Sequence, residues 1–180
     1  MNIFNGKSLI PSKMPITTVM TDSCNTGGAG VFQGDWFYCN WQLDWPKFKD
    51  HHINYKEILA ILLAAYRWGP MWAGKRIYVY TDNMVAIAAI NKAKCKCSKI
   101  LEGIRVLFWL SVKYDFHLTA FHIAGVRNFE ADLISRLLDP KYFDQFLNIY
   151  PVYKMNVLFH MSFNSAVSVF RGCFPATGVG

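Results

Sequence analysis

Cysteine is scarce in the sequence, and its few positions fit neither a disulfide framework nor a zinc finger. The five cysteines are Cys24, Cys39, Cys95, Cys97 and Cys173. An odd number without framework spacing argues against a disulfide-stapled secreted domain. Cys95 and Cys97 are too close for the usual pairing of zinc ligands, and no Cys or His pair follows them at finger spacing. We therefore expect reduced thiols in an intracellular protein, either cytoplasmic or nuclear.

Long hydrophobic runs are also absent. The longest apolar run, Ile58 to Ala65, stops at Tyr66 and is far shorter than the roughly 20 residues that a membrane-spanning helix needs. The opening segment, MNIFNGKSLIPSKMP, lacks the apolar core of a signal peptide. We expect neither a cleaved leader nor a membrane partner.

Acidic residues are fewer than basic ones. Nineteen Lys and Arg face twelve Asp and Glu, which gives a formal net charge of +7. This balance favours a polyanionic partner, although it also suits plain solubility. The 53% of apolar residues and 16% of aromatic residues exclude a disordered chain and allow a sizeable core.

Hydrophobic periodicity and turn residues predict a single layered domain. We expect an irregular lead-in at 1–15, an α/β domain at 16–138 and an extension of unknown structure at 139–180. Strands are expected at 17–23, in a hairpin over 28–42 with its tight turn at Gly34-Asp35, at 76–80 and at 117–123. Helices are expected from Asn54 to the break at Gly69-Pro70, at 84–90, at 101–115 and at 130–138. This order implies a mixed sheet flanked by helices, with Gly27, Gly28 and Gly30 loosening the chain before the hairpin.

Two of the predicted strands end in the same dipeptide. Asp22 follows the strand of TTVMTDS, and Asp82 follows the strand of IYVYTDN. Either aspartate alone is readily explained as a turn former or a helix cap. Because ligands gather at the carboxyl ends of strands in such sheets, the repeated Thr-Asp ending suggests that two carboxylates are brought together.

Two further carboxylates are candidates for the same site. Glu57 fits the capping-box spacing with Asn54, but the helix that it begins is strongly apolar, so Glu57 lies on or beside the face that meets the sheet. Asp132 lies on the last predicted helix between Ala131 and Leu133. Several carboxylates at one point are tolerated when they bind a hard cation such as Mg²⁺, and two such ions can activate a water and stabilise a leaving oxygen.

Four segments, in this order, resemble the ribonuclease H domain of retroelement polyproteins. They are TDSC (21–24), HINYKEILAILLA (52–64), VYTDN (79–83) and HIAGVRNFEADLISR (122–136). The resemblance covers about residues 15–138 and is strongest to DIRS-like elements, in which a reverse transcriptase precedes this domain. It implies a ribonuclease H-like fold with a five-stranded mixed sheet, and hydrolysis of the RNA strand of RNA–DNA hybrids.

The resemblance also implies roles for individual residues. Asp22, Glu57, Asp82 and Asp132 match the four carboxylates that hold two Mg²⁺ ions, for which Mn²⁺ can substitute. His122 matches the histidine that assists proton movement or product release; without the motif, a strand histidine that faces solvent or is satisfied in the core would be the favoured interpretation. Asn128 matches the asparagine of the same motif, which orients the loop and is grouped here with the substrate-binding residues.

Substrate contacts are expected beside the first aspartate and in a lysine-rich turn. The expected contacts are the side chains of Ser23, Asn25 and Thr26, the backbone N–H groups of Gly27 and Gly28, and Lys92, Lys94, Lys96 and Lys99. Contacts to 2′-hydroxyl groups distinguish RNA from DNA, and lysines hold phosphates in a salt-dependent way. A solvated basic turn explains the four lysines about as well.

Three functional hypotheses follow. The first is a metal-dependent endonuclease acting on hybrids, as a part or remnant of a retrotransposon polyprotein. The second is a catalytically inactive nucleic-acid-binding module of the same fold, and the third is a nuclease or transposase of that fold acting on DNA. The complete set of four carboxylates and His122 favours the first.

Overall fold

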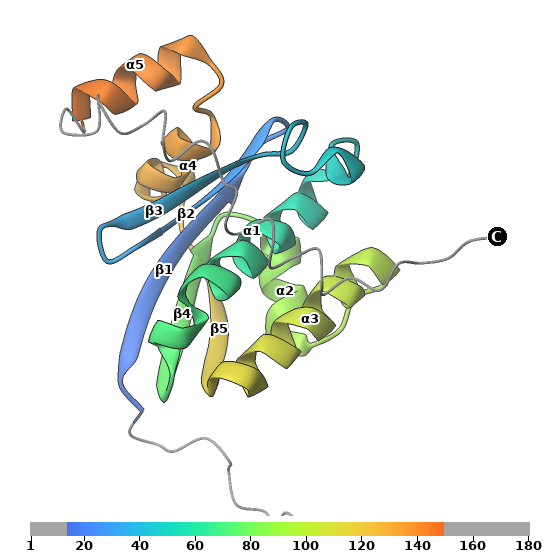
Figure 1. Cartoon of the computed structure of the whole chain (residues 1–180). Coiled ribbons are helices and arrows are strands. Elements are labelled where there is room, and N and C mark those ends of the chain that lie inside the picture. The colour runs from blue at the N-terminus through green and yellow to red at the C-terminus, as the bar shows by residue number, and fades with distance from the viewer. Residues whose placement is uncertain (1–13, 150–180) are drawn as a thin grey trace, which may run out of the picture.

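A five-stranded sheet with helices on both faces forms the framework of the computed structural model, which describes residues 14–149 (Figure 1). The strands are β1 (Ile16–Ser23), β2 (Gly27–Phe32), β3 (Asp35–Asn40), β4 (Lys75–Thr81) and β5 (Phe116–His122). The α-helices are α1 (Ile53–Trp68), α2 (Met84–Lys92), α3 (Ser98–Tyr114), α4 (Phe129–Ser135) and α5 (Pro140–Ile149). Short 3₁₀ turns occupy Pro46–Phe48, Gly69–Trp72 and Gly125–Arg127. Our expectations for residues 1–13 and 150–180 lie outside the described residues.

The strand order is β3-β2-β1-β4-β5. Strands β1, β2 and β3 pair antiparallel, whereas β1 pairs with β4, and β4 with β5, in parallel. The predicted mixed sheet flanked by helices is therefore confirmed. Because β1, β4 and β5 run in the same direction, the residues that follow them meet at one edge of the sheet.

The core is divided by the sheet into two clusters. The larger one lies between the sheet and α1, whose residues from Tyr55 to Ala65 are all buried. The alternation along β3 shows the division, since Phe37 belongs to this cluster and Trp36 to the one beneath α4 and α5. Helix α1 is apolar on nearly every side because it is enclosed by the sheet and by α3.

The hairpin differs from its prediction in two details. The turn lies at Gln33-Gly34, where φ is 51° and 81°, and Asp35 already begins β3. The glycines at 27 and 28 do not loosen the chain; they are part of β2. A Cβ on Gly27 would lie 2.4 Å from the Ser135 carbonyl oxygen, so glycine there permits the close approach of α4.

The end of the described chain contains an element that periodicity did not predict. Helix α4 stops at Ser135, three residues before the expected end at 138, and α5 follows from Pro140. Phe146 of α5 is fully buried and packs edge-on against Trp36, with 5.3 Å between ring centroids. Helix α5 therefore packs beside α4 (Figure 1) and reaches the hairpin through Phe146.

Two further expectations can be compared with the structure. Cys24, Cys39, Cys95 and Cys97 are free, as predicted, and Cys173 lies outside the described residues. Between residues 14 and 149, no helix has the combination of length and apolar character that crossing a bilayer requires.

Candidate metal centre

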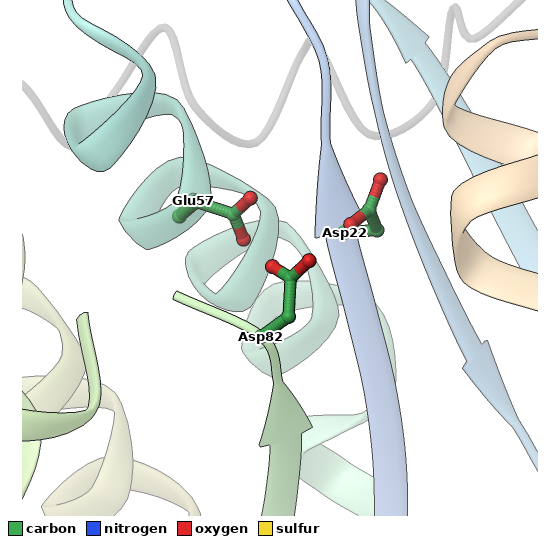
Figure 2. Close-up of side chains that lie close together, drawn as sticks. All are labelled: Asp22, Glu57 and Asp82. Atoms are coloured by element: carbon green, nitrogen blue, oxygen red, sulfur yellow. The ribbon is translucent and has the colours of Figure 1, made fainter. Parts of the chain in front are cut away.

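Three carboxylates from separate elements converge at the edge where the parallel strands end. Asp22 lies on β1, Glu57 lies on α1, and Asp82 is the residue that follows β4. The three side chains point toward one another (Figure 2). One oxygen of each lies within 4.8 Å of one oxygen of the other two. Oxygen donors in such a group suit a hard divalent cation.

The register of the sheet explains why the two aspartates meet. Met20 of β1 is level with Tyr80 of β4 in the parallel pairing. Asp22 and Asp82 each follow two residues later, so the two Thr-Asp endings reach the sheet edge at the same height. Asp22 is buried, with 4% of its surface exposed, whereas Asp82 is exposed.

Glu57 bridges the same two strands. Its Oε1 accepts a hydrogen bond from the Ser23 N–H at 3.2 Å, and its Oε2 accepts one from the Thr81 hydroxyl at 3.2 Å. The capping-box alternative is wrong, because the N-cap of α1 is His52, whose Nδ1 accepts from the Asn54 N–H. Glu57 is the fifth residue of α1, two positions past the one that a capping box would use, and it lies on the face that meets the sheet.

Burial and mutual repulsion perturb both buried carboxyls. Burial is the main reason that the pKa of Glu57 is raised to about 9, and the charges of Asp22 and Asp82 act in the same direction. The pKa of Asp22 is raised to about 6, again chiefly by burial. Ionising both groups in the absence of a cation is therefore unfavourable, and a bound cation would relieve that cost.

Asp132 lies outside the group of three. It is on α4, and its Oδ1 accepts a hydrogen bond from Arg136 Nε at 2.7 Å. Its charge nevertheless contributes to raising the pKa of Asp22, so it lies within electrostatic reach of the cluster. The structure thus assembles three of the four predicted ligands and pairs the fourth with an arginine.

His122 lies on the neighbouring strand at the same edge. It is exposed at the end of β5 and is paired in register with Thr81, the residue before Asp82. The loop that follows β5 passes close to the cluster, since a Cβ on Gly125 would lie 3.6 Å from Asp82 Oδ2. His122 therefore lies on the strand beside Asp82, at the same edge of the sheet.

Asn128 is placed in the interior and not on a substrate-facing surface. Its side chain is completely buried, and its Nδ2 donates a hydrogen bond to the Thr21 carbonyl at 3.0 Å. It ties the loop before α4 to the strand that carries Asp22. A contact between this side chain and substrate would therefore require the loop to move, and the role of Asn128 stays a prediction.

The residues after Asp22 divide into a buried and an exposed part. Ser23 is buried, and its hydroxyl has no hydrogen-bond partner. Asn25 and Thr26 are exposed in the turn between β1 and β2. The Gly27 N–H, expected to contact substrate, donates to Cys24 Sγ at 3.2 Å.

The four lysines predicted to contact phosphates are all exposed, and two of them line a hollow near the carboxylate cluster. Lys92 ends α2, Lys94 and Lys96 lie in the following turn, and Lys99 is in the first turn of α3. A hollow of about 490 Å³ is lined by Lys96, Lys99, His51, His52 and Asn54, among others. Asn54 Oδ1 in turn accepts a hydrogen bond from Asn83 Nδ2 at 3.0 Å, which joins this hollow to the residue after Asp82.

Sequence reasoning missed several side chains that hold the site. Lys56 is buried, and its Nζ donates to the carbonyls of Asn25 at 2.8 Å and Lys49 at 2.6 Å. Ser135 is also buried, and its hydroxyl donates to Asp22 Oδ2 at 2.7 Å. A lysine inside an apolar helix and a serine in the segment 122–136 are unusual enough to notice in the sequence. Their hydrogen-bond partners could not be inferred, because most of them lie far from Lys56 and Ser135 along the chain.

The fold and the carboxylate cluster together define a ribonuclease H-like α/β domain with an acidic centre suited to a divalent metal. The crystal structure of RNase H1 from the halophilic archaeon Halobacterium salinarum has this fold, with a TM-score of 0.52 and 13% sequence identity. The alignment covers 68% of this chain and 96% of that chain. No family model matches the sequence, and no curated protein matches it.

Proposed function

We propose that this protein is a metal-dependent endonuclease that hydrolyses the RNA strand of RNA–DNA hybrids. The observation that carries the proposal is the convergence of Asp22, Glu57 and Asp82 within 4.8 Å at the sheet edge. The ribonuclease H-like fold and the four sequence segments that resemble retroelement ribonucleases H support the choice of substrate.

The donor set fits a hard cation such as Mg²⁺, with Mn²⁺ as a substitute. All three converging groups offer carboxylate oxygens, and two of them are buried with raised pKa values. Asp22, Glu57 and Asp82 would hold the first ion, and Asp132 would join them for a second. When bound, the two ions would supply an activated water and neutralise the leaving oxygen of the phosphodiester.

The protein groups around the ions have separate tasks. Glu57 is held by Ser23 and Thr81, so its carboxylate stays in place at the junction of β1 and β4. His122, exposed on the adjacent strand, carries a proton between the reacting water or product and solvent. Hydrolysis breaks the P–O bond to the leaving ribose oxygen as the water oxygen bonds to phosphorus.

Substrate recognition is assigned to the surroundings of the cluster. Asn25 and Thr26 are exposed in the turn that follows β1 and would contact 2′-hydroxyl groups. Lys96 and Lys99, on the hollow connected through Asn54, would contact phosphates together with Lys92 and Lys94. The net charge of +7 favours such a polyanionic ligand.

The proposal includes a biological setting that rests on the resemblance. The chain is part or remnant of a retrotransposon polyprotein, acts inside the cell and works beside a reverse transcriptase domain. The resemblance over residues 15–138 and the free cysteines support this setting.

The test is a cleavage assay with labelled RNA–DNA hybrid, duplex DNA and duplex RNA in Mg²⁺ or Mn²⁺. We expect cleavage of the hybrid RNA, its loss with EDTA, and a reduction of at least about 100-fold in Asp82→Asn. Asp144→Asn, which removes the same charge from an exposed position on α5, should leave cleavage unchanged.

The outcomes separate the alternatives. Uncut hybrid, or equal cutting by Asp82→Asn, would refute the proposal. Tight binding without cleavage would indicate an inactive nucleic-acid-binding module. Preferential cutting of duplex DNA would indicate a DNA-acting nuclease or transposase of the same fold.

A further inference from the structure

Arg136 connects the fourth carboxylate to the helix that follows it. Its Nε donates to Asp132 Oδ1 at 2.7 Å, an i,i+4 pair whose side chains are 40% and 34% exposed. On its other side, the guanidinium lies over the ring of Tyr142 in α5, 5.4 Å from the centroid. Arg136 is therefore held between Asp132 and an aromatic ring.

This arginine supplies positive charge at the acidic edge. It lies near enough to Asp22 to oppose the increase of that carboxyl's pKa. The guanidinium is hydrogen-bonded to Asp132 and acts on Asp22 only through its charge. A cation that used the Asp132 oxygens would meet both the hydrogen bond and the repulsion of Arg136.

We propose that Arg136 is a resident counter-ion of Asp132, and that a divalent cation gains this carboxylate only by displacing the guanidinium. The inference rests on the metal site of the proposed function. Arg136 is in this view a positioning residue: it holds Asp132 away from the group of three until a cation replaces it. The first cation, bound by Asp22, Glu57 and Asp82, is affected less than the second.

Helix α5 has a part in this exchange. Tyr142 offers the displaced guanidinium a cation–π partner, so Arg136 does not have to move into solvent. The helix is anchored by the burial of Phe146 against Trp36. Helix α5 would thereby contribute to how strongly the site retains a second ion.

The test measures cation binding directly, without substrate. Mn²⁺ is titrated into the full chain and followed by calorimetry and by the electron paramagnetic resonance of free Mn²⁺. In Arg136→Gln we expect the weaker of the two binding steps to tighten by about two- to five-fold, the range of a partly exposed ion pair. Arg136→Lys, which keeps the charge, should stay within about two-fold of wild type.

Two controls isolate the role of Asp132. Lys141→Gln removes a positive charge that also lies over Tyr142, at 5.8 Å, and should leave Mn²⁺ binding unchanged. In the Asp132→Asn background, adding Arg136→Gln should have no further effect on the second step. Circular dichroism confirms that each variant is folded.

The outcomes distinguish this inference from the proposed function. If wild type binds no Mn²⁺, the metal-dependent function itself fails. If wild type binds Mn²⁺ but Arg136→Gln binds equally or more weakly, Arg136 does not compete with the cation and only this inference is overturned. If Lys141→Gln tightened Mn²⁺ binding as much as Arg136→Gln, the effect would come from the net charge alone, and this inference would also be overturned.

Discussion

Ser135 Oγ lies 2.7 Å from Asp22 Oδ2, and both side chains are buried. The hydroxyl also lies 2.9 Å from the Asp132 carbonyl oxygen, which fixes its position on α4. A hydrogen bond donated to a carboxylate favours the ionised form, which is the form that binds a cation. Ser135 thus stabilises the ionised form of Asp22, although the two residues are 113 positions apart in the sequence.

Replacing this hydroxyl should weaken the metal centre without removing a ligand. In Ser135→Ala we expect the pKa of Asp22 to rise further and Mn²⁺ affinity to fall by roughly ten-fold, since a hydrogen bond to a buried charge is worth about 1.5–3 kcal/mol. Carboxyl NMR titration and calorimetry measure the two effects. Ser111→Ala removes a hydroxyl that donates to the Phe108 carbonyl on α3 and should change neither.

The raised pKa of Glu57 makes a prediction for stability against pH. Its ordinary pKa is 4.5, and burial with two neighbouring carboxylates raises it to about 9 in the folded protein. The folded chain holds this proton more tightly than the unfolded chain does, so the contribution to stability is complete below pH 4.5 and is lost as the pH rises toward 9. In EDTA, the free energy of unfolding should therefore fall across this window.

Glu57→Gln should remove most of that dependence. The amide oxygen can accept from the Ser23 N–H, the amide nitrogen can donate to the Thr81 hydroxyl, and the side chain carries no charge. At pH 8 in EDTA we therefore expect the variant to have a free energy of unfolding higher than wild type by on the order of 2–4 kcal/mol. Urea denaturation at pH 5 and pH 8 provides the measurement. Glu102→Gln, at an exposed position on α3, should follow wild type. A variant with an unchanged pH profile would contradict the assignment of the effect to Glu57.

Much of the fold could be predicted because the strands and helices that enclose the larger core cluster have clear period-2 and period-3.6 patterns of hydrophobic residues. The two Thr-Asp endings could be matched in sequence because parallel strands end at one edge, and the register of Met20 with Tyr80 brings Asp22 and Asp82 level. The sequence predicts that α1 begins at Asn54, one residue after its observed start at Ile53, because His52 caps the helix with a ring nitrogen and not with one of the usual oxygen-bearing side chains.

Other features depend on partners that no local pattern reveals. Helix α5 is not predicted from the sequence, because the partners of its apolar residues are Trp36 and the neighbouring residues of the hairpin and of α4, which lie far away along the chain. The glycines of β2 resembled a loop, yet Gly28 is a strand residue over which the Trp41 ring lies, 2.3 Å from where a Cβ would be. The pairing of Asp132 with Arg136 could be drawn from i,i+4 spacing, but the position of Tyr142 beside the same guanidinium could not.

Lys56 should be essential for the order of the turn after Asp22. Its buried amine satisfies the carbonyls of Asn25 and Lys49, and burial lowers its pKa. Lys56→Met fills a similar volume but leaves both carbonyls without this donor, and we expect a loss of about 1–3 kcal/mol in unfolding free energy. The turn at Asn25 and Thr26 should also exchange its amide hydrogens faster.

The matched control for that variant is Lys49→Met. Lys49 is exposed and contributes only its backbone carbonyl to the contact, so the substitution retains the acceptor. Hydrogen exchange and urea denaturation compare the two proteins. Equal stability of Lys56→Met and Lys49→Met would show that the buried amine does not hold the turn.

Asn91 protects the outer edge of the sheet. Strand β5 is the last in the sheet order, and both the N–H and the carbonyl of Ala120 are bonded to the Asn91 side chain, at 2.9 Å and 2.8 Å. The amide of Asn91 thus takes the place of a neighbouring strand at this point. An edge strand with free backbone groups is a template for pairing with another chain.

Asn91→Ala should therefore lower the unfolding free energy by about 1 kcal/mol and promote association through β5. We expect faster growth of thioflavin T fluorescence under mild heating, with a rate that increases with protein concentration. Asn91→Asp keeps the acceptor for the Ala120 N–H but places an oxygen against the Ala120 carbonyl, so its free energy of unfolding should be no higher than that of Asn91→Ala. Its negative charge should nevertheless slow association. Asn148→Ala, on the exposed surface of α5, should behave as wild type. If Asn91→Ala and Asn148→Ala aggregate at the same rate, the contact with Ala120 does not guard the edge.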